Sequence, residues 1–278
     1  MIRIGYMGPE GTFSQQAAEE YSGDDRTHVL ICFDSIPEVL YAIHDNDIDE
    51  AVVPIENSLE GAVNATLDIL SGEFDLMIRA ELVMSIKQNL LVKKGTAISD
   101  IRRIYSHPQP VGQCRIFLRE KLPGVEYRYF ESTVSAAAAV AAEDGGSAAI
   151  CSASAARIYG LDIAAGDIQD SMNNFTRFAV VSHTDGIRTG SDKSSIVFST
   201  EDKPGSLYRI LDIFSLWDLN MTRIESRPAK NKLGRYIFFI DFNGHRDDND
   251  VKDALTMIQR KTSFYKFLGS YPQFPVQD

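Results

Sequence analysis

The order of elements in the last third of the chain constrains the fold most strongly. Short apolar runs predict strands there, and Leu207, Ile210 and Phe214 recur at the spacing of one face of a helix. The expected elements are a strand over residues 195–200, a helix from Pro204, strands over 220–226 and 236–242 around a turn at 231–234, a helix over 250–260 and a strand over 264–269. This βαββαβ order is typical of the ferredoxin-like fold.

The chain before about residue 182 alternates β-rich runs with helical patterns, which predicts an α/β fold. A weak internal repeat indicates that this region has two similar halves. Two predicted helices begin at Ser35 and Ser132, 97 residues apart, and each helix is followed by an apolar strand. We therefore expect two α/β lobes with a ligand cleft between them, at the carboxyl ends of the strands. The expected limits are residues 1–183 for this domain (lobes at about 1–80 plus 168–183, and 81–167), 184–193 for a linker and 194–273 for the tail domain.

Charge and cysteine content narrow the classes of function. A formal net charge of −11 without a long basic run argues against binding to nucleic acid or to an anionic membrane surface. No apolar run approaches membrane-spanning length. Cys32, Cys114 and Cys151 lack close spacing, which is typical of reduced thiols in a cytoplasmic protein. No cluster of His, Cys, Asp and Glu has metal-ligand spacing, so no metal is expected.

Residues 173–178 (NNFTRF) combine a hydroxyl, a guanidinium and two amides directly before an apolar strand. Such a turn can bind a small oxyanion. The planar guanidinium of Arg177 suits a carboxylate, and the hydroxyl of Thr176 suits a leaving oxygen. The alternative is a polar loop in which Arg177 pairs with a surface carboxylate.

A polar turn also follows the apolar strand of the first lobe. Glu56, Asn57 and Ser58 lie where the strand over residues 51–53 ends. A helix cap would account for Asn57 or Ser58 but leaves Glu56 beside an apolar strand end. This favours a functional site.

The second lobe has its own polar turn at the corresponding place. Ser106 and His107 follow a predicted strand, and Gln113 lies one helical turn further on. His107 is a candidate general base, but a structural hydrogen bond is the favoured interpretation. Ser132 and Thr133 begin an alanine-rich helix, where their hydroxyls could cap the helix or bind a carboxylate of a ligand.

Taken together and in order, these motifs resemble those of the prephenate dehydratase family. The matching segments are residues 8–14 (GPEGTFS), 54–58 (PIENS), 106–109 (SHPQ) and 176–178 (TRF). The tail resembles the ACT regulatory domain through residues 204–207 (PGSL) and 225–228 (ESRP). The resemblance covers nearly the whole chain. It implies a monofunctional, P-protein-like enzyme whose two-lobed catalytic domain is similar to periplasmic binding proteins.

The activity that the resemblance implies is that of a carbon–oxygen lyase. It would convert prephenate to phenylpyruvate with loss of water and carbon dioxide, in phenylalanine biosynthesis, and without a cofactor. Two other interpretations stay open. In the first, the substrate would be arogenate, and the product would be phenylalanine itself. In the second, the protein would be a non-catalytic two-lobed regulator that binds an amino acid.

The same resemblance assigns roles to individual residues. Thr176 contacts the departing hydroxyl of the substrate, within a network that reaches Glu56 or a water molecule. The expected substrate-binding residues are Arg177, Phe178, Asn57, Ser58, Ser106, Gln113, Ser132 and Thr133.

For the tail, the resemblance implies L-phenylalanine as an allosteric effector. Gly205 would let the effector approach the backbone, and residues 225–228 would lie at an interface between paired tails, so a homodimer or homotetramer is expected. The family's Gly-Ala-Leu motif has a serine at its centre here, at Ser206. The expected effector residues are Gly205, Ser206, Leu207, Asn220, Glu225, Ser226, Arg227 and Pro228.

Overall fold

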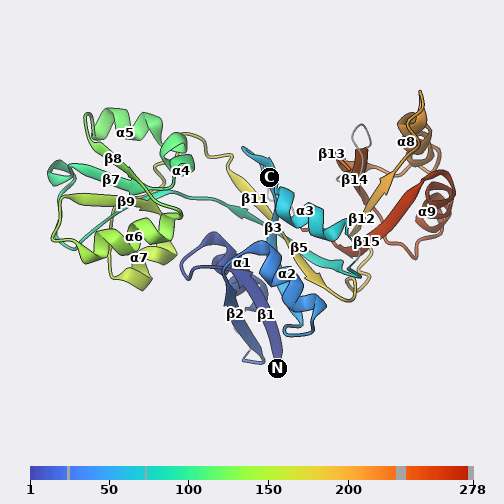
Figure 1. Ribbon diagram of the computed structural model, residues 1–278, viewed down its shortest axis with the longest axis horizontal. Helices are drawn as coiled ribbons and strands as arrows, with labels where there is room; N and C mark the ends of the chain where they lie inside the picture. Colours follow the sequence, from blue (N-terminus) through green and yellow to red (C-terminus); the bar gives the residue numbers. More distant parts are fainter. Residues whose placement is uncertain (24–25, 73, 230–235, 275–278) are drawn as a thin grey trace. The chain divides into compact units, whose positions relative to one another are not determined.

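The computed structural model describes residues 1–23, 26–72, 74–229 and 236–274 (Figure 1). The chain forms two compact units. Unit 1 comprises Met1–Val39, Glu56–Gly61 and Met84–Thr176, and unit 2 comprises Leu40–Ile55, Ala62–Val83 and Arg177–Asp278. These limits differ from the expected domain limits, which stay a prediction.

Unit 1 begins with a parallel pair of strands. β1 (Ile2–Met7) pairs with β2 (His28–Phe33), and the helix α1 (Phe13–Ser22) connects them. Thr12 caps this helix, because its side chain accepts a hydrogen bond from the backbone N–H of Gln15. The connection between the first strand and the helix therefore ends in a well-defined helix N-terminus.

The rest of unit 1 is built on a five-stranded sheet with the order β10-β6-β9-β7-β8. The strands are β6 (Asn89–Val92), β7 (Arg103–Ser106), β8 (Glu126–Tyr129), β9 (Ser147–Cys151) and β10 (Asp162–Ala165). β7 runs parallel to β8 and to β9, whereas β6 is antiparallel to β9 and to β10. The mixed α/β class expected from the sequence is confirmed.

Apolar side chains alternate between the two faces of this sheet and build two cores. Leu91, Tyr105 and Ala149 pack with α6 (Thr133–Ala142) and α7 (Ala153–Tyr159). Their strand neighbours Leu90, Ile104 and Ile150 pack on the other face, against the side of α5 (Arg115–Lys121). The short helix α4 (Pro108–Gln113) precedes α5 (Figure 1). Both faces are covered, as expected for a sheet with parallel pairs.

Most of a second group of strands, in the order β3-β11-β5, belongs to unit 2, and the last or first two residues of each strand belong to unit 1. Their bounds are β3 (Glu50–Asn57), β5 (Met77–Ser85) and β11 (Phe175–Ser182). Three further elements lie next to β3 in the sequence. They are the helix α2 (Ile36–His44) before it, and the short strand β4 (Gly61–Ala62) and the helix α3 (Asn64–Leu70) after it. The unit boundary cuts β11 between Thr176 and Arg177.

The tail of unit 2 is a four-stranded antiparallel sheet in the order β13-β14-β12-β15. Its elements are β12 (Asp192–Ser199), α8 (Ser206–Leu216), β13 (Met221–Pro228), β14 (Tyr236–Asn243), α9 (Asn249–Lys261) and β15 (Phe264–Pro272). Both helices pack on one face, around Ile196, Phe198 and Ile240. The βαββαβ prediction is confirmed, and the turn expected at 231–234 lies outside the described residues.

The helix α3 is held at both ends by side chains of the tail sheet. From β13, Arg227 donates to Asn64 Oδ1 at 2.6 Å and pairs with Asp68 at 2.9 Å. From β15, the Lys266 ammonium donates to the carbonyl oxygens of Leu70 and Phe74, at 2.7 and 2.5 Å. Because β13 and β15 are the two edge strands, α3 extends across the width of this sheet.

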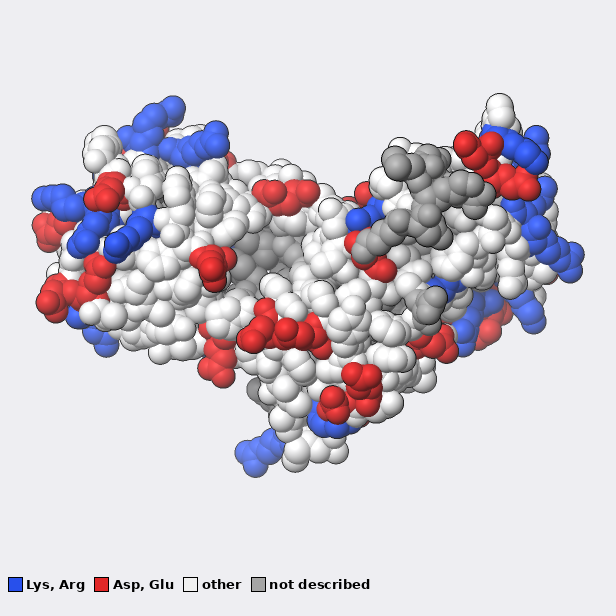
Figure 2. Space-filling view, viewed as in Figure 1, with Lys and Arg blue, Asp and Glu red and all other residues white. Residues whose placement is uncertain are grey.

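Charged side chains of both signs are interspersed over the described residues of the face drawn in Figure 2. No helix within the described ranges is long and apolar enough to cross a membrane.

Candidate functional site

Unit 1 contains a cavity of about 290 Å³, called pocket A below, where several strand ends and helix starts meet. This volume suits a ligand of the size of a small metabolite. The residues that line it are Phe13, Asn57, Ile86, Gln88, His107, Gln109, Pro110, Gln113, Glu131, Ser132, Thr133, Asn174 and Thr176. Most of these side chains are polar, and among the described lining residues none is Lys or Arg.

A hydrogen bond between Asn57 and Thr176 lies at the centre of pocket A. Asn57 Nδ2 donates to Thr176 Oγ1 at 2.9 Å, and Thr176 is 8% exposed. The amide orientation is fixed, since Asn57 Oδ1 accepts from the backbone N–H groups of Leu59 and Glu60 at 2.9 and 3.0 Å. Thr176 Oγ1 is therefore an acceptor toward Asn57, so its own hydroxyl hydrogen is available to another acceptor.

Further amides extend this contact across the pocket. Asn57 Nδ2 also lies 2.9 Å from Asn174 Oδ1, and Asn174 Nδ2 donates to Gln113 Oε1 at 3.2 Å. Gln113 Oε1 accepts a second hydrogen bond from Gln88 Nε2 at 3.4 Å. Each of these contacts joins a donor to an acceptor, so the four amides form one consistently oriented chain that ends at Thr176.

Two helices of ten residues each begin at the pocket. Phe13 is the first residue of α1, and Ser132 and Thr133 lie at the start of α6. Ser132 and Ser135 form a capping box, which leaves other N–H groups of the first turn of α6 without a helical partner. Helix N-termini carry partial positive charge and favour an anion nearby. These helix N-termini can therefore attract a carboxylate although no described lining residue is Lys or Arg.

His107 also lines pocket A, although the sequence favoured a structural role. Its Nδ1 accepts a hydrogen bond from the backbone N–H of Gln109 at 3.3 Å, which caps α4. In the neutral imidazole the proton then resides on Nε2, so this atom is a donor. His107 thus caps a helix and lines the pocket at once.

The structure brings five of the ten expected residues together and places the other five outside the pocket lining. Asn57, Gln113, Ser132, Thr133 and Thr176 share pocket A. Glu56, Ser58 and Ser106 do not line it, and neither do Arg177 and Phe178, which are described below. Ser58 Oγ donates to Asn173 O at 2.7 Å, and the buried Ser106 donates to Ile150 O at 3.0 Å, so both hydroxyls connect backbone segments. Glu56 is half-buried and has an interaction partner, but it is not a lining residue.

Arg177 has different partners from those expected. In unit 2 its Nε donates to Glu81 at 2.7 Å, and its terminal nitrogens donate to Asp241 at 2.5 Å and to the Tyr271 hydroxyl at 2.9 Å. Successive residues of a strand point to opposite faces, so Arg177 points away from the side of Thr176. Its guanidinium thus contacts two buried carboxylates, and Arg177 is not among the residues that line pocket A, so its expected role as a substrate ligand stays a prediction. Phe178, 2% exposed, belongs to the core.

The pKa values of this ion-pair group reflect burial and pairing together. Burial disfavours the charged form of Arg177, yet Asp241, Tyr271 and Glu81 together outweigh this effect and raise the Arg177 pKa well above its ordinary value. Burial likewise acts to raise the pKa of Asp241, but attraction by Arg177 and Arg223 leaves that pKa below its usual range. Arg177 and Asp241 are therefore both ionised at neutral pH.

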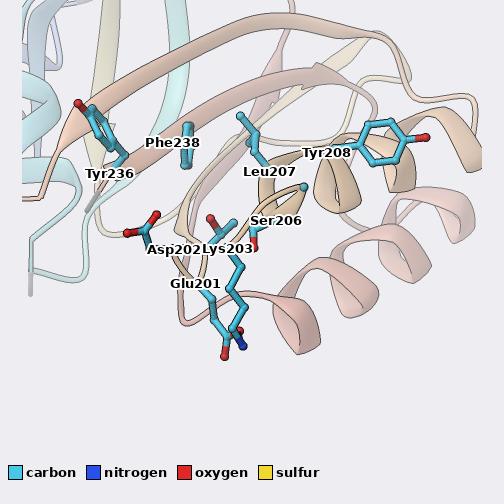
Figure 3. Close-up of a pocket in the computed structure, with 10 residues that line it drawn as sticks. Glu201, Asp202, Lys203, Ser206, Leu207, Tyr208, Tyr236 and Phe238 are labelled. Carbon is cyan, nitrogen blue, oxygen red and sulfur yellow. The ribbon is translucent and has the colours of Figure 1, made fainter. Parts of the chain in front are cut away.

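The tail carries a second cavity of about 280 Å³, pocket B, around the start of α8 (Figure 3). Gly205, Ser206 and Leu207 of the expected effector set line it. Gly205 has a left-handed φ of 78°, which only glycine adopts without strain. Figure 3 shows Leu207 beside Phe238, and Tyr208 turned away. The lining residues that the sequence did not indicate are Thr200, Glu201, Asp202, Lys203, Tyr208, Tyr236 and Phe238.

The other expected effector residues do not line pocket B. They lie just before or on β13, the edge strand, and comprise Asn220, Glu225, Ser226, Arg227 and Pro228. Arg227 binds α3, as described above, and its side chain is 15% exposed. Among the described residues no group of three or more His, Cys, Asp or Glu could hold a metal ion.

Comparisons with known proteins agree with this arrangement. The prephenate dehydratase family model matches residues 4–186, and the ACT domain model matches residues 194–256. The chain is 42% identical, over its whole length and 75% of the relative, to a bifunctional chorismate mutase/prephenate dehydratase of Aquifex aeolicus. It is 37% identical to a prephenate dehydratase of Mycolicibacterium vanbaalenii, over 98% of the chain and 91% of that relative.

A solved structure supports the same relationship. The crystal structure of prephenate dehydratase from Arthrobacter aurescens in complex with L-Phe aligns with a TM-score of 0.90 and 38% sequence identity. The alignment covers 98% of this chain and 90% of that one.

Proposed function

The chain belongs to the prephenate dehydratase family and carries an ACT domain, and from this premise we propose that pocket A converts prephenate to phenylpyruvate. Prephenate is a cyclohexadiene with a ring carboxylate and a hydroxyl at opposite ring carbons. The bond to the carboxylate breaks, its electron pair completes the aromatic ring, and the carbon–oxygen bond to the hydroxyl breaks. The dianion takes up one proton and gives phenylpyruvate, carbon dioxide and water.

The observation that carries the proposal is the hydrogen bond from Asn57 to Thr176. It occupies a lone pair of Thr176 Oγ1 and directs the hydroxyl hydrogen away from Asn57. Thr176 donates this hydrogen to the leaving oxygen, so the oxygen departs as water rather than as hydroxide, and solvent then returns one proton to Thr176 Oγ1. The Asn57 N–H stabilises the negative charge that grows on Thr176 Oγ1 in this step. A positioned proton donor of this kind contributes about 10²–10⁴-fold in rate.

The lack of a Lys or Arg among the described lining residues fits a decarboxylation. A guanidinium clamped on the ring carboxylate would stabilise the ground state more than the transition state, in which that charge is being lost. In pocket A the pyruvyl carboxylate binds at the N-terminus of α6, beside Ser132 and Thr133. The ring carboxylate lies toward the apolar side chains of Phe13 and Ile86, where its charge is poorly solvated.

Phenylalanine regulates the enzyme through the tail domain. Support comes from the ACT match, from pocket B and from the related structure that contains L-Phe. If phenylalanine opposes prephenate binding, linkage requires prephenate to oppose phenylalanine binding by the same factor. Exposed Ile224 and Tyr236 on neighbouring strands of the tail support assembly into a homodimer or homotetramer. The free thiols support a cytoplasmic location.

The test supplies prephenate and arogenate separately and follows phenylpyruvate and phenylalanine formation, with and without added phenylalanine. The proposal expects phenylpyruvate from prephenate and inhibition by phenylalanine. A faster reaction with arogenate would assign the substrate differently. Absence of product from both substrates would leave the interpretation as a binding protein.

A further inference from the structure

Glu131 is the single Asp, Glu, Lys or Arg among the described residues that line pocket A. It directly precedes Ser132, which caps α6 through its own side chain, so the Glu131 carboxylate is not needed as the cap. The residue is exposed, and its carboxylate makes no hydrogen bond or ion pair with the described part of the chain. The candidate site therefore has a negative charge at its edge that no described cation neutralises.

The neighbouring cavity does not supply a compensating charge. This cavity, of about 520 Å³, shares Gln113 and Asn174 with pocket A. Its described lining contains one guanidinium, that of Arg115, and two carboxylates, those of Glu60 and Asp170. The charged side chains around pocket A are thus predominantly acidic, although the N-terminus of α6 attracts a carboxylate.

The start of α6 and Glu131 together match the head group of an α-amino acid. In the proposed function the side-chain carboxylate of the substrate binds at the N-terminus of α6, beside Ser132 and Thr133. The next carbon of that side chain carries a keto oxygen in prephenate and an ammonium in arogenate. Glu131 lines the same cavity of about 290 Å³ and adjoins Ser132 in the chain, so its charge acts on this position even without direct contact.

The sign of this interaction differs between the two substrates. Prephenate has two carboxylates and no cation, so the charge of Glu131 opposes its binding. Arogenate has the same two carboxylates and an ammonium, which Glu131 attracts. The N-terminus of α6 holds the side-chain carboxylate of either substrate and cannot distinguish them, so the discrimination falls to Glu131.

We propose that Glu131 determines which side chain pocket A accepts, because its carboxylate binds the ammonium of arogenate and disfavours the prephenate dianion. This role rests on the proposed function and deepens it, since it names the residue that distinguishes an amino acid from a keto acid. Glu131 takes no part in bond breaking. Its effect lies in the ratio of kcat/KM for the two substrates.

Glu131→Gln removes the charge and keeps the size of the side chain. For prephenate kcat/KM should rise about 2–5-fold, and for arogenate it should fall about 2–5-fold, the range of an exposed ion pair. Where arogenate reacts slowly, its competition with prephenate measures its affinity instead. Both changes should shrink at high ionic strength, because salt screens an exposed carboxylate.

Two variants serve as controls. Glu131→Asp keeps the charge and should keep the wild-type preference. Glu126→Gln removes the same charge from an exposed residue of β8 that does not line pocket A, and it should leave the preference unchanged. A preference that is unchanged in Glu131→Gln, or kcat/KM values that change equally for both substrates, would overturn the proposal. Glu131 would then only stabilise the start of α6 by its charge.

The wild-type protein separates failure of this proposal from failure of the proposed function. If it forms phenylpyruvate from prephenate, and arogenate neither reacts nor competes, only the role of Glu131 fails. If it forms no product from either substrate, the proposed function fails and the role of Glu131 fails with it.

Discussion

Replacing Arg177 with methionine tests whether this residue acts as a structural cation or as a substrate ligand. Methionine has a similar length but no charge, so Glu81 and Asp241 would lose a shared cation. Their side chains are only 2% and 3% exposed. Removing one partner from a buried ion pair costs about 3–5 kcal/mol, because the remaining charge is left uncompensated.

The lower end of that range applies here. Lys193 still pairs with Glu81 at 2.7 Å, and Arg223 still attracts Asp241. We therefore expect Arg177→Met to lower the free energy of unfolding by about 3 kcal/mol. At about 2–4 °C per kcal/mol, the melting temperature should fall by about 6–12 °C.

The loss should also depend on pH, in a direction that the pKa of Asp241 sets. In the wild-type protein this pKa is depressed, so the stabilisation is present above the ordinary pKa of about 3.9 and disappears as pH falls through the folded-state value. Without Arg177, burial dominates and raises the Asp241 pKa. The difference in stability should therefore be full at pH 7 and shrink toward pH 4.

Urea denaturation across this pH range measures the effect, with Arg177→Met, Asp241→Asn and the double variant. The double variant should lose less than the two single losses combined, since the two side chains interact directly. The reasoning would be refuted if Arg177→Met kept wild-type stability at pH 7 and instead raised the KM for prephenate strongly. That outcome would restore Arg177 as a substrate ligand.

Three other substitutions test separate parts of the structure. Thr176→Val should reduce kcat for prephenate by about 10²-fold or more, with KM within about threefold, and wild-type turnover would exclude Thr176 as the proton donor. Gly269→Ala should destabilise far more than Gly190→Ala, by about 3 kcal/mol against about 1 kcal/mol in urea denaturation. Both glycines have positive φ, but only at Gly269 would a Cβ meet a backbone atom, Ile78 O at 2.2 Å, and equal losses would contradict this. Glu143→Gln should weaken the dependence of stability on pH near pH 4. The hydrogen bond from Ser147 lowers the Glu143 pKa, so the stabilisation of the fold by this carboxylate is present above the ordinary pKa and is lost as pH falls. An unchanged dependence of the free energy of unfolding on pH below about pH 5 would contradict this role of Glu143.

The features predictable from the sequence are those with local signals. The tail was predictable because its apolar residues recur at strand and helix periods within each element, as Ile210 and Phe214 do on α8. Asn57, Ser132 and Thr176 were found because each lies in a polar turn beside an apolar strand or at a helix start. Such positions gather at one end of a sheet in α/β folds.

The features that escaped prediction depend on contacts between distant residues. The partners of Arg177 lie 96, 64 and 94 residues away, so no local pattern reveals that its guanidinium is already occupied. Gln88 gave no signal because it lies within a short polar stretch, Lys87–Asn89, before the apolar run at 90–92. Arg227 belongs to a recognisable motif, yet its contacts with Asn64 and Asp68 appear only after folding.

The alternation of Thr176 and Arg177 along β11 has a consequence for insertions and deletions. A shift of one residue in the alignment of this strand exchanges the two sides, so the guanidinium would enter the reaction cavity and the hydroxyl would face Glu81 and Asp241. A shift of β11 by one residue would therefore remove the proton donor from the cavity and leave two buried carboxylates without their cation. The loop before Phe175 should therefore tolerate substitutions far better than changes in length.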